Sequence, residues 1–201
     1  MKKFQEKKFN IPALKGISAK NIEEHLKLYA GYVKNANLIL DHIAELSKDA
    51  EKNAYELNEI QRRFSFEYNG IRNHECYFSH FEGGPKALAA SSVLKTAIEA
   101  EWGSFDAWLA RFKAIGMTRG LGWAILYYDA HDDRLVNAWV DEQHLGQLNS
   151  AAPILMLDMW EHSYVADYQP SGRKNYLEDF FANLNWQTME ENFAAASGTG
   201  K

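Results

Sequence analysis

The sequence predicts an α+β fold in which a helical half precedes a small antiparallel sheet. Three observations predict it: apolar residues recur at helical spacing between residues 18 and 80, strand-like runs follow Gly116, and helical spacing returns near the end of the chain. Helices followed by a group of strands are typical of α+β proteins. We expect an N-terminal helical hairpin domain over residues 1–85 and a C-terminal domain over residues 86–201, in which helices flank a three-stranded antiparallel sheet.

Two long helices are expected in the N-terminal half, after an extended segment at residues 1–17. Ser18 is a suitable N-cap for the first helix, which is predicted over residues 18–46. Its apolar positions are Ile22, Leu26, Tyr29, Val33, Ala36, Leu40 and Ile43. A polar connection follows, and a second helix is predicted over residues 58–80. The glycines and proline at 83–85 would end that helical region.

The C-terminal half is expected to combine short helices with three strands. Two helices are expected within residues 88–115, the second beginning at Ser104. Residues 123–128 and 135–140 have the aromatic and β-branched composition of strands, and a turn joins them. The remaining elements expected are a third strand at 154–157, helices at 176–184 and 188–195, and a disordered tail at 198–201.

Composition indicates an ordinary globular protein. Hydrophobic residues make up 46% and charged residues 24% of the 201 positions. The formal net charge of -5 argues against a nucleic-acid partner, because phosphate binding depends on clustered Lys and Arg. Neither a signal peptide nor an apolar run long enough to span a membrane is found, so no membrane partner is expected. The single Cys76 cannot form an internal disulfide, which favours a cytoplasmic location.

The strongest functional signal is the run Asp158-Met159-Trp160-Glu161-His162, directly after the apolar residues 154–157. Charged groups leave water readily only when they are paired or bind a metal. A carboxylate and an imidazole four residues apart, at the end of a buried strand, are therefore candidate metal ligands.

This run resembles the D-x-W-E-H signature of the iron and manganese superoxide dismutases. Residues 18–25 resemble that family's S-A-x-T-I-E-x-H, and the segment around His74 resembles its N-H-x-x-F-W. The resemblance implies that one Mn or Fe ion per subunit is bound by His25, His74, Asp158 and His162. Taken alone, His25 would be interpreted as a surface histidine, whereas His74 would fit a core histidine and a metal ligand equally well. Three imidazoles and a carboxylate suit Mn or Fe, and would also permit Zn.

The resemblance covers nearly the whole chain. Residues 101–106, 120–124 and 167–186 are similar to the family's F-G-S-F-x-x-F, G-S-G-W-x-W and D-Y-x-x-x-R-x-x-Y with N-W elements. In that family two tryptophans form the wall of the metal pocket, and Trp123 and Trp160 match them. The simpler reading of each tryptophan is core packing, and both roles can hold together.

The position of one glutamine distinguishes the two metals within the family, because it hydrogen-bonds the metal-bound solvent and tunes the metal. Typical iron enzymes carry it on the second ligand helix, four residues before the histidine. Manganese enzymes have Gly there and take the Gln from the loop before the last strand. Gly70 and Gln143 match the manganese arrangement, so Mn is favoured over Fe, with His144 as an alternative to Gln143.

The resemblance also implies a homodimer, with a tetramer as the alternative. Glu161 matches the acid that bridges to a metal-ligand histidine of the partner subunit, and Tyr164 matches a residue that reaches across the same interface. The alternative for Glu161 is a solvent-exposed acid.

The chain departs from the family at the gateway tyrosine. The family has H-x-x-x-H-H before a tyrosine eight residues after the first ligand, whereas Tyr32 follows His25 by seven and both extra histidines are absent. One residue fewer turns a helix by about 100°, so we hypothesise that the usual helix has a one-residue bulge that this chain lacks. Tyr32 is expected to be the gate, with Tyr29 the alternative. Phe78 replaces a tryptophan of the family.

The activity implied is dismutation of superoxide to O2 and H2O2, with Gln143 and Tyr32 setting the protonation of the bound solvent. Local positive charge would attract the anion; the candidates are Arg72, Lys27 and Arg173, although the favoured interpretation of all three is ordinary surface charge. The main alternative is a non-catalytic metal-binding relative, which the altered gate favours and the complete ligand set opposes. A zinc hydrolase is the other alternative.

Overall fold

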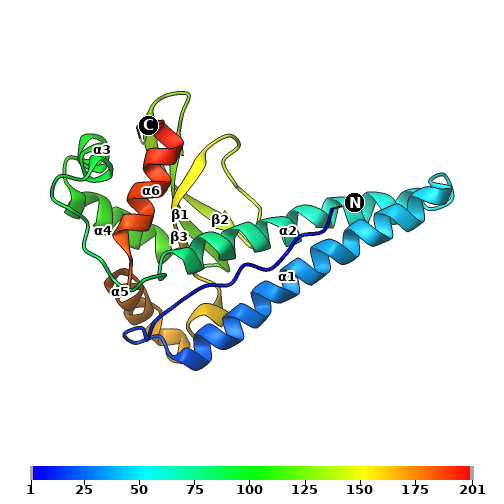
Figure 1. The fold of residues 1–201 in the computed structure, drawn as a ribbon, viewed down its shortest axis with the longest axis horizontal. Coiled ribbons are helices and arrows are strands. Elements are labelled where there is room, and N and C mark those ends of the chain that lie inside the picture. Colours follow the sequence, from blue (N-terminus) through cyan, green and yellow to red (C-terminus); the bar gives the residue numbers. More distant parts are fainter. Residues whose placement is uncertain (1, 200–201) are drawn as a thin grey trace.

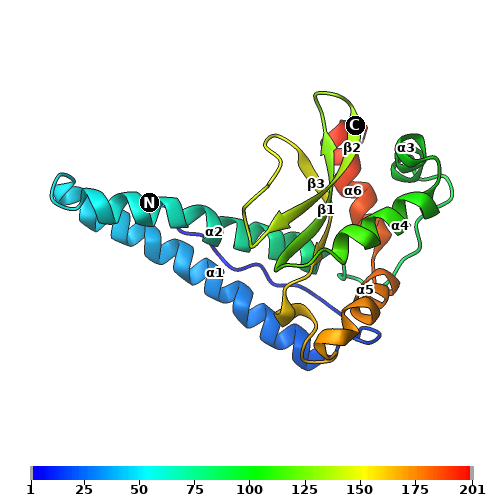
Figure 2. The ribbon, with the colours of Figure 1, turned by 180° about the vertical axis from the view of Figure 1, so that it is seen from behind.

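A long helical hairpin forms one end of the molecule, and the remaining elements gather at its base (Figure 1). The computed structural model describes residues 2–199, so the tail expected at 198–201 lies partly outside the described residues. The hairpin consists of α1 (Ala19–Leu46) and α2 (Ala54–Ser79), joined by the short 3-10 helix η1 (Ser47–Asp49) and a turn. The extended segment before α1 runs along the hairpin in both views (Figures 1 and 2).

The two long helices begin where their caps and buried residues require. The Ser18 side chain accepts a hydrogen bond from the Asn21 amide, as the N-cap prediction requires. The second helix begins at Ala54 rather than at Asn58, so the predicted boundary is wrong. The polar appearance of this stretch hid two anchors: Leu57 is buried, and the Asn53 side chain donates to the Leu46 carbonyl at 3.0 Å.

The C-terminal half contains the predicted three-stranded antiparallel sheet, in the order β2-β1-β3. The α+β class is therefore confirmed. Its elements are α3 (Val93–Trp102), α4 (Phe105–Gly116), β1 (Gly122–Asp129), β2 (Arg134–Asp141), β3 (Ala152–Asp158), η2 (Glu161–Ser163), η3 (Pro170–Gly172), α5 (Arg173–Ala182) and α6 (Trp186–Ser197). Helices α3, α4 and α6 pack against the sheet on the side away from the hairpin's tip, and α2 packs against β3 (Figure 2).

One cluster of buried apolar side chains extends through both halves. It joins Ile71 and Tyr77 of α2 to Ile125 and Leu157 of the sheet, so the hairpin and the sheet are held together by shared packing. The division into domains at residues 85 and 86 stays a prediction. Within residues 2–199, none of the helices is both long enough and apolar enough to cross a bilayer.

The open edge of β3 is covered by a side chain of α6 and by that of His80, the C-cap of α2. The Asn192 side chain of α6 donates to the Ile154 carbonyl at 3.1 Å, and the Met156 amide donates to Nε2 of His80 at 3.0 Å. An uncovered strand edge would have unpaired backbone groups available to another chain. These contacts therefore cover the outer edge of β3 at Ile154 and Met156.

His80 gives the fold a predicted sensitivity to acid. Because Nε2 accepts from the Met156 amide, the imidazole must be neutral, and burial lowers the pKa of His80 to about 3. In the unfolded chain this histidine binds a proton near pH 6.5, whereas in the folded chain it stays neutral. The free energy of unfolding therefore falls as pH drops below that value, by up to about 1.4 kcal/mol per pH unit. We expect urea unfolding at pH 5–7.5 to give a shallower pH slope for His80→Gln than for the unaltered protein.

The matched control is His42→Gln, which changes an exposed histidine of α1. Its slope should equal that of the unaltered protein. Equal slopes for His80→Gln and His42→Gln would contradict the assignment to His80.

Candidate metal centre

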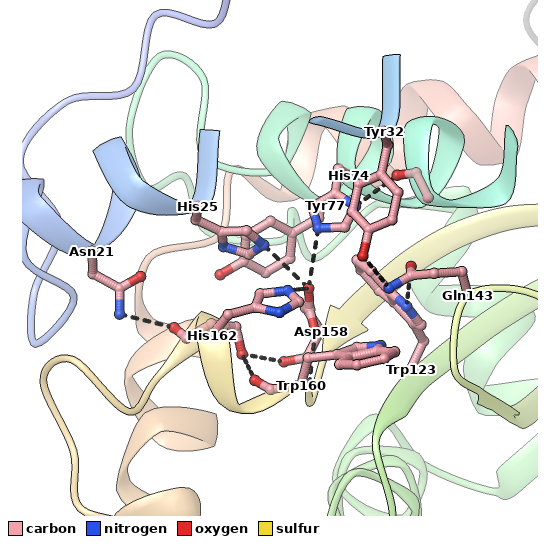
Figure 3. Close-up of polar contacts among 12 residues, drawn as sticks. Asn21, His25, Tyr32, His74, Tyr77, Trp123, Gln143, Asp158, Trp160 and His162 are labelled. Carbon is pink, nitrogen blue, oxygen red and sulfur yellow. Dashed lines mark hydrogen bonds and ion pairs between the residues drawn. The ribbon is translucent and has the colours of Figure 1, made fainter. Parts of the chain in front are cut away.

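Four side chains converge from the two halves of the chain: His25 of α1, His74 of α2, Asp158 at the end of β3, and His162 of η2 (Figure 3). One potential ligand atom from each lies within 4.8 Å of the others. The Nε2 atoms of His25, His74 and His162 lie 3.2, 3.7 and 3.2 Å from Oδ2 of Asp158. The structure thus brings together all four residues predicted as metal ligands.

The hairpin fixes the two helical imidazoles by different means. Nδ1 of His74 lies 2.6 Å from the Gly70 carbonyl, and since a carbonyl only accepts, Nδ1 has the proton and Nε2 is the free ligand atom. His25 has no hydrogen bond at either nitrogen among the described residues. Aromatic packing holds it instead: its ring centroid lies 5.1 Å from that of Tyr77 and 4.9 Å from that of Phe78.

Backbone contacts fix the Asp158 carboxylate. The residue pairs with Trp123 across β1 and β3, and its carbonyl accepts hydrogen bonds from the Tyr176 hydroxyl at 2.9 Å and the Ser163 hydroxyl at 3.1 Å. The Trp160 amide donates to Oδ1 at 2.8 Å. Oδ1 is thereby engaged, and Oδ2 faces the imidazoles. Sequence analysis missed Tyr176 and Ser163 as supports, although Tyr176 belongs to the D-Y-x-x-x-R-x-x-Y motif.

Protonation in the cluster suits a cation. Burial lowers the pKa of His25, and burial with the neighbouring His25 lowers the pKa of His74 to about 3. Burial raises the pKa of Asp158, but the adjacent imidazoles of His162 and His25 more than offset it and hold that pKa below its ordinary value. Metal binding requires neutral imidazoles and an ionised carboxylate, and the lowered pKa values of His25, His74 and Asp158 favour those states.

Unpartnered polar atoms test whether a metal ion fits here. Both nitrogens of His25 and Nε2 of His74 are buried without a hydrogen-bond partner among the described residues. Each such group costs about 1–3 kcal/mol. A cation among these atoms would satisfy Nε2 of both residues, and the nitrogen and oxygen donors suit Mn or Fe. The residues present therefore fit the metal that the sequence implies.

Gln143 connects two more predicted residues beside His74 (Figure 3). Its buried side chain accepts a hydrogen bond from Nε1 of Trp123 at 3.0 Å and donates one to the Tyr32 hydroxyl at 3.0 Å. The ring centroids of Tyr32 and His74 are 5.0 Å apart. Asn73 donates to the Gln143 carbonyl at 3.0 Å, a support that sequence analysis missed although the residue directly precedes His74.

The Tyr32 ring packs directly against Gly70. A Cβ atom added to Gly70 would lie 2.3 Å from the Tyr32 ring, so a side chain cannot enter while Tyr32 keeps its position. The alternative gate, Tyr29, is directed elsewhere: its hydroxyl donates to Glu75 at 3.1 Å and accepts from the Lys7 amide at 2.8 Å. α1 runs as an uninterrupted α-helix through this region, without a bulge.

The remaining predicted residues lie at the rim of the cluster. Trp160 stacks on His162 with ring centroids 5.6 Å apart, and its Nε1 donates to the Glu142 carbonyl at 3.1 Å. His144 packs edge-on against Phe66 instead of facing the cluster.

The two residues predicted at a dimer interface lie outside the four-residue cluster. The Glu161 side chain is exposed. Tyr164 is buried, with its ring 5.4 Å from that of Tyr176. Their roles in a dimer stay predictions.

Comparison with known proteins agrees with this geometry. The family described as "Iron/manganese superoxide dismutases, C-terminal domain" matches residues 90–192. The chain is 38% identical over 186 residues to "Superoxide dismutase [Fe]" of Cupriavidus metallidurans, covering 91% of each chain. It is 35% identical to the protein of the same name from Aquifex pyrophilus, covering 91% of this chain and 87% of the relative. It is 31% identical to "Superoxide dismutase [Mn]" of Mycolicibacterium smegmatis, covering 86% and 82%.

A family match over half of the chain, relatives similar along most of its length, and a cluster of three histidines and an aspartate lead to one conclusion: this chain belongs to the iron/manganese superoxide dismutase family.

Proposed function

We propose that this protein is a superoxide dismutase with one metal ion per subunit, held by His25, His74, Asp158 and His162. The observation that carries the proposal is the convergence of these four side chains, from four separate elements, within 4.8 Å of one another. Bound manganese or iron supplies one-electron redox chemistry, by which one superoxide is oxidised to O2 and a second, with two protons, is reduced to H2O2. The names of the relatives support this activity.

The protein's own contribution is to exclude water and to hold a proton at one atom. Trp123 and Trp160 line the cluster on two sides, which lowers the local dielectric. Burial raises the pKa of Tyr32, so its hydroxyl stays protonated at neutral pH. Because that hydroxyl accepts from Gln143, its own hydrogen is available to an oxygen atom in the pocket. Tyr32 is thus the proposed gate and proton donor.

We propose manganese as the metal, with iron as the alternative. Gly70 and Gln143 support manganese, because the Tyr32 ring fills the space that a glutamine at position 70 would need. The relatives with 38% and 35% identity are named for iron and those with 31% for manganese, so identity alone does not choose.

We further propose a homodimer, with a tetramer as the alternative, and a cytoplasmic location. Glu161 is exposed beside His162, whose side chain is 20% exposed, and this supports a bridge between one subunit's acid and the other's imidazole. Tyr164 would lie at the same interface. Cys76, the sole cysteine, is a free thiol that suits a reducing compartment.

The decisive experiment is metal analysis of the purified protein combined with a superoxide-consumption assay. We expect one Mn or Fe per chain and rapid consumption. Asp158→Asn removes the one anionic ligand and should lower metal affinity by more than about 100-fold, beyond the loss typical of outer supports. Asp106→Asn, at an exposed acid of α4, is the control and should keep both properties. A protein that binds one ion but leaves superoxide unconsumed would be the non-catalytic relative instead.

If Tyr32 is the proton donor, removing its hydroxyl should change how kcat depends on pH. Tyr32→Phe removes the hydroxyl but keeps the ring, and should lower kcat by at least about tenfold and alter product inhibition. Tyr29→Phe should leave both unchanged, because that hydroxyl faces Glu75. Stopped-flow kinetics between pH 6 and 10 would measure this. Identical profiles for Tyr32→Phe and the unaltered protein would rule out the role.

The shared space of Gly70 and Tyr32 predicts a steric effect. Gly70→Ala should cost about 1–3 kcal/mol of unfolding free energy through overpacking, and adding Tyr32→Ala should remove that extra cost. Gly31→Ala is the control, since a Cβ there meets no atom within 4 Å and should stabilise α1 by about 0.5–1 kcal/mol. Urea unfolding of the unaltered protein, Gly70→Ala, Gly31→Ala, Tyr32→Ala and the double variant would test it. A neutral Gly70→Ala would refute the packing argument.

A further inference from the structure

Arg63 lies against a row of aromatic rings, Phe66 and Tyr32, that leads to His74. The Arg63 guanidinium carbon is 3.7 Å from the centre of the Phe66 ring. The Phe66 ring in turn lies 5.9 Å from the Tyr32 ring and 5.6 Å from the His144 ring. Tyr32 in turn packs on His74, so the Phe66 ring is the one layer between Arg63 and Tyr32.

Arg63 is also the partner of a buried acid. Nε of Arg63 lies 3.3 Å from Oε1 of Glu67, and the Glu67 side chain is 7% exposed. This is the one hydrogen bond that the Glu67 carboxylate makes among residues 2–199. Without Arg63, the Glu67 carboxylate would be a buried and uncompensated negative charge.

Among the described residues, none of the three cations considered from sequence stacks on a ring that touches Tyr32. Arg72 forms an ion pair with Glu75 at 2.6 Å, Lys27 pairs with two acids of its own helix, and Arg173 donates to the Gly116 carbonyl at 3.1 Å. Among the cations of residues 2–199, Arg63 is the one stacked on a ring that touches Tyr32. Its side chain is 54% exposed, so ions in solution can reach it.

We propose that Arg63 attracts the superoxide anion to the Tyr32 side of the pocket and cancels the charge of the buried Glu67. The inference rests on the proposed function, because it takes a small anion as the substrate. A chain of net charge -5 repels anions at long range, so a local positive group is needed to raise their concentration at the pocket. Stacking on Phe66 holds the guanidinium at that position.

The test compares two adjacent arginines of α2. Arg63→Gln and Arg62→Gln change the net charge equally, but Arg62 is 75% exposed and pairs with Glu59, outside the contacts described above. At an ionic strength of about 10 mM, Arg63→Gln should lower kcat/KM for superoxide about three- to tenfold, and the difference should shrink below about twofold near 500 mM, where charges are screened. Arg62→Gln should match the unaltered protein at both ionic strengths.

A double variant separates charge from structure. Arg63→Gln with Glu67→Gln removes both members of the pair, and should recover most of the lost kcat/KM at low salt. A merely structural role predicts further loss instead, with falling metal content. The proposal is overturned if Arg63→Gln equals Arg62→Gln at low salt, if its effect does not change with salt, or if the double variant shows no recovery.

Azide association makes the result independent of turnover. The rate at which azide binds to the metal-loaded protein, followed by the absorption of the metal, should show the same order of variants and the same salt dependence. If the unaltered protein fails to consume superoxide, the proposed function falls, and the azide rates still decide the role of Arg63. Absence of both turnover and azide binding overturns both proposals.

Discussion

A single ionised carboxylate inside the protein, that of Asp158, is the feature on which the rest of the structure depends. Burying a charge costs several kcal/mol unless its partners compensate. Three imidazoles surround it from separate elements, two on the arms of the hairpin and one on η2, and a cation shared by these four side chains would supply the compensating charge. The hairpin must therefore meet the sheet in one orientation. The continuous apolar core that joins them holds that orientation.

The contacts that cover the edge of β3 and those that hold Asp158 lie along one strand. His80 and Asn192 occupy hydrogen-bonding positions along β3, and Tyr176 binds the carbonyl of its last residue. They come from the C-cap of α2, from α6 and from α5. The contacts that stabilise this strand therefore also help to orient the side chain of its last residue, Asp158. Sites built on such paired, capped strands keep their geometry better than sites on loops.

The element order and the two candidate ligands in the D-x-W-E-H run could be predicted from sequence because both depend on local patterns. The start of α2 was misplaced because buried Leu57 lies in a stretch of polar composition. Contacts between distant elements were beyond local pattern: that Tyr32 fills the space over Gly70 depends on how two helices meet. His25 alone has the features of a surface histidine, and its family context marked it as a ligand. Supports such as Ser163 act through backbone groups that no side-chain pattern reveals.

The two helical histidines of the proposed metal site lie near the start of α1 and the end of α2, whereas the turn between these helices lies at the far end of the hairpin (Figure 1). That end is open to solvent, with Tyr55 77% exposed. Lengthening or shortening both arms there by whole helical turns would leave the phase of His25 relative to His74 unchanged. The protruding turn therefore tolerates insertions and deletions that the base of the hairpin, which holds the histidines, does not.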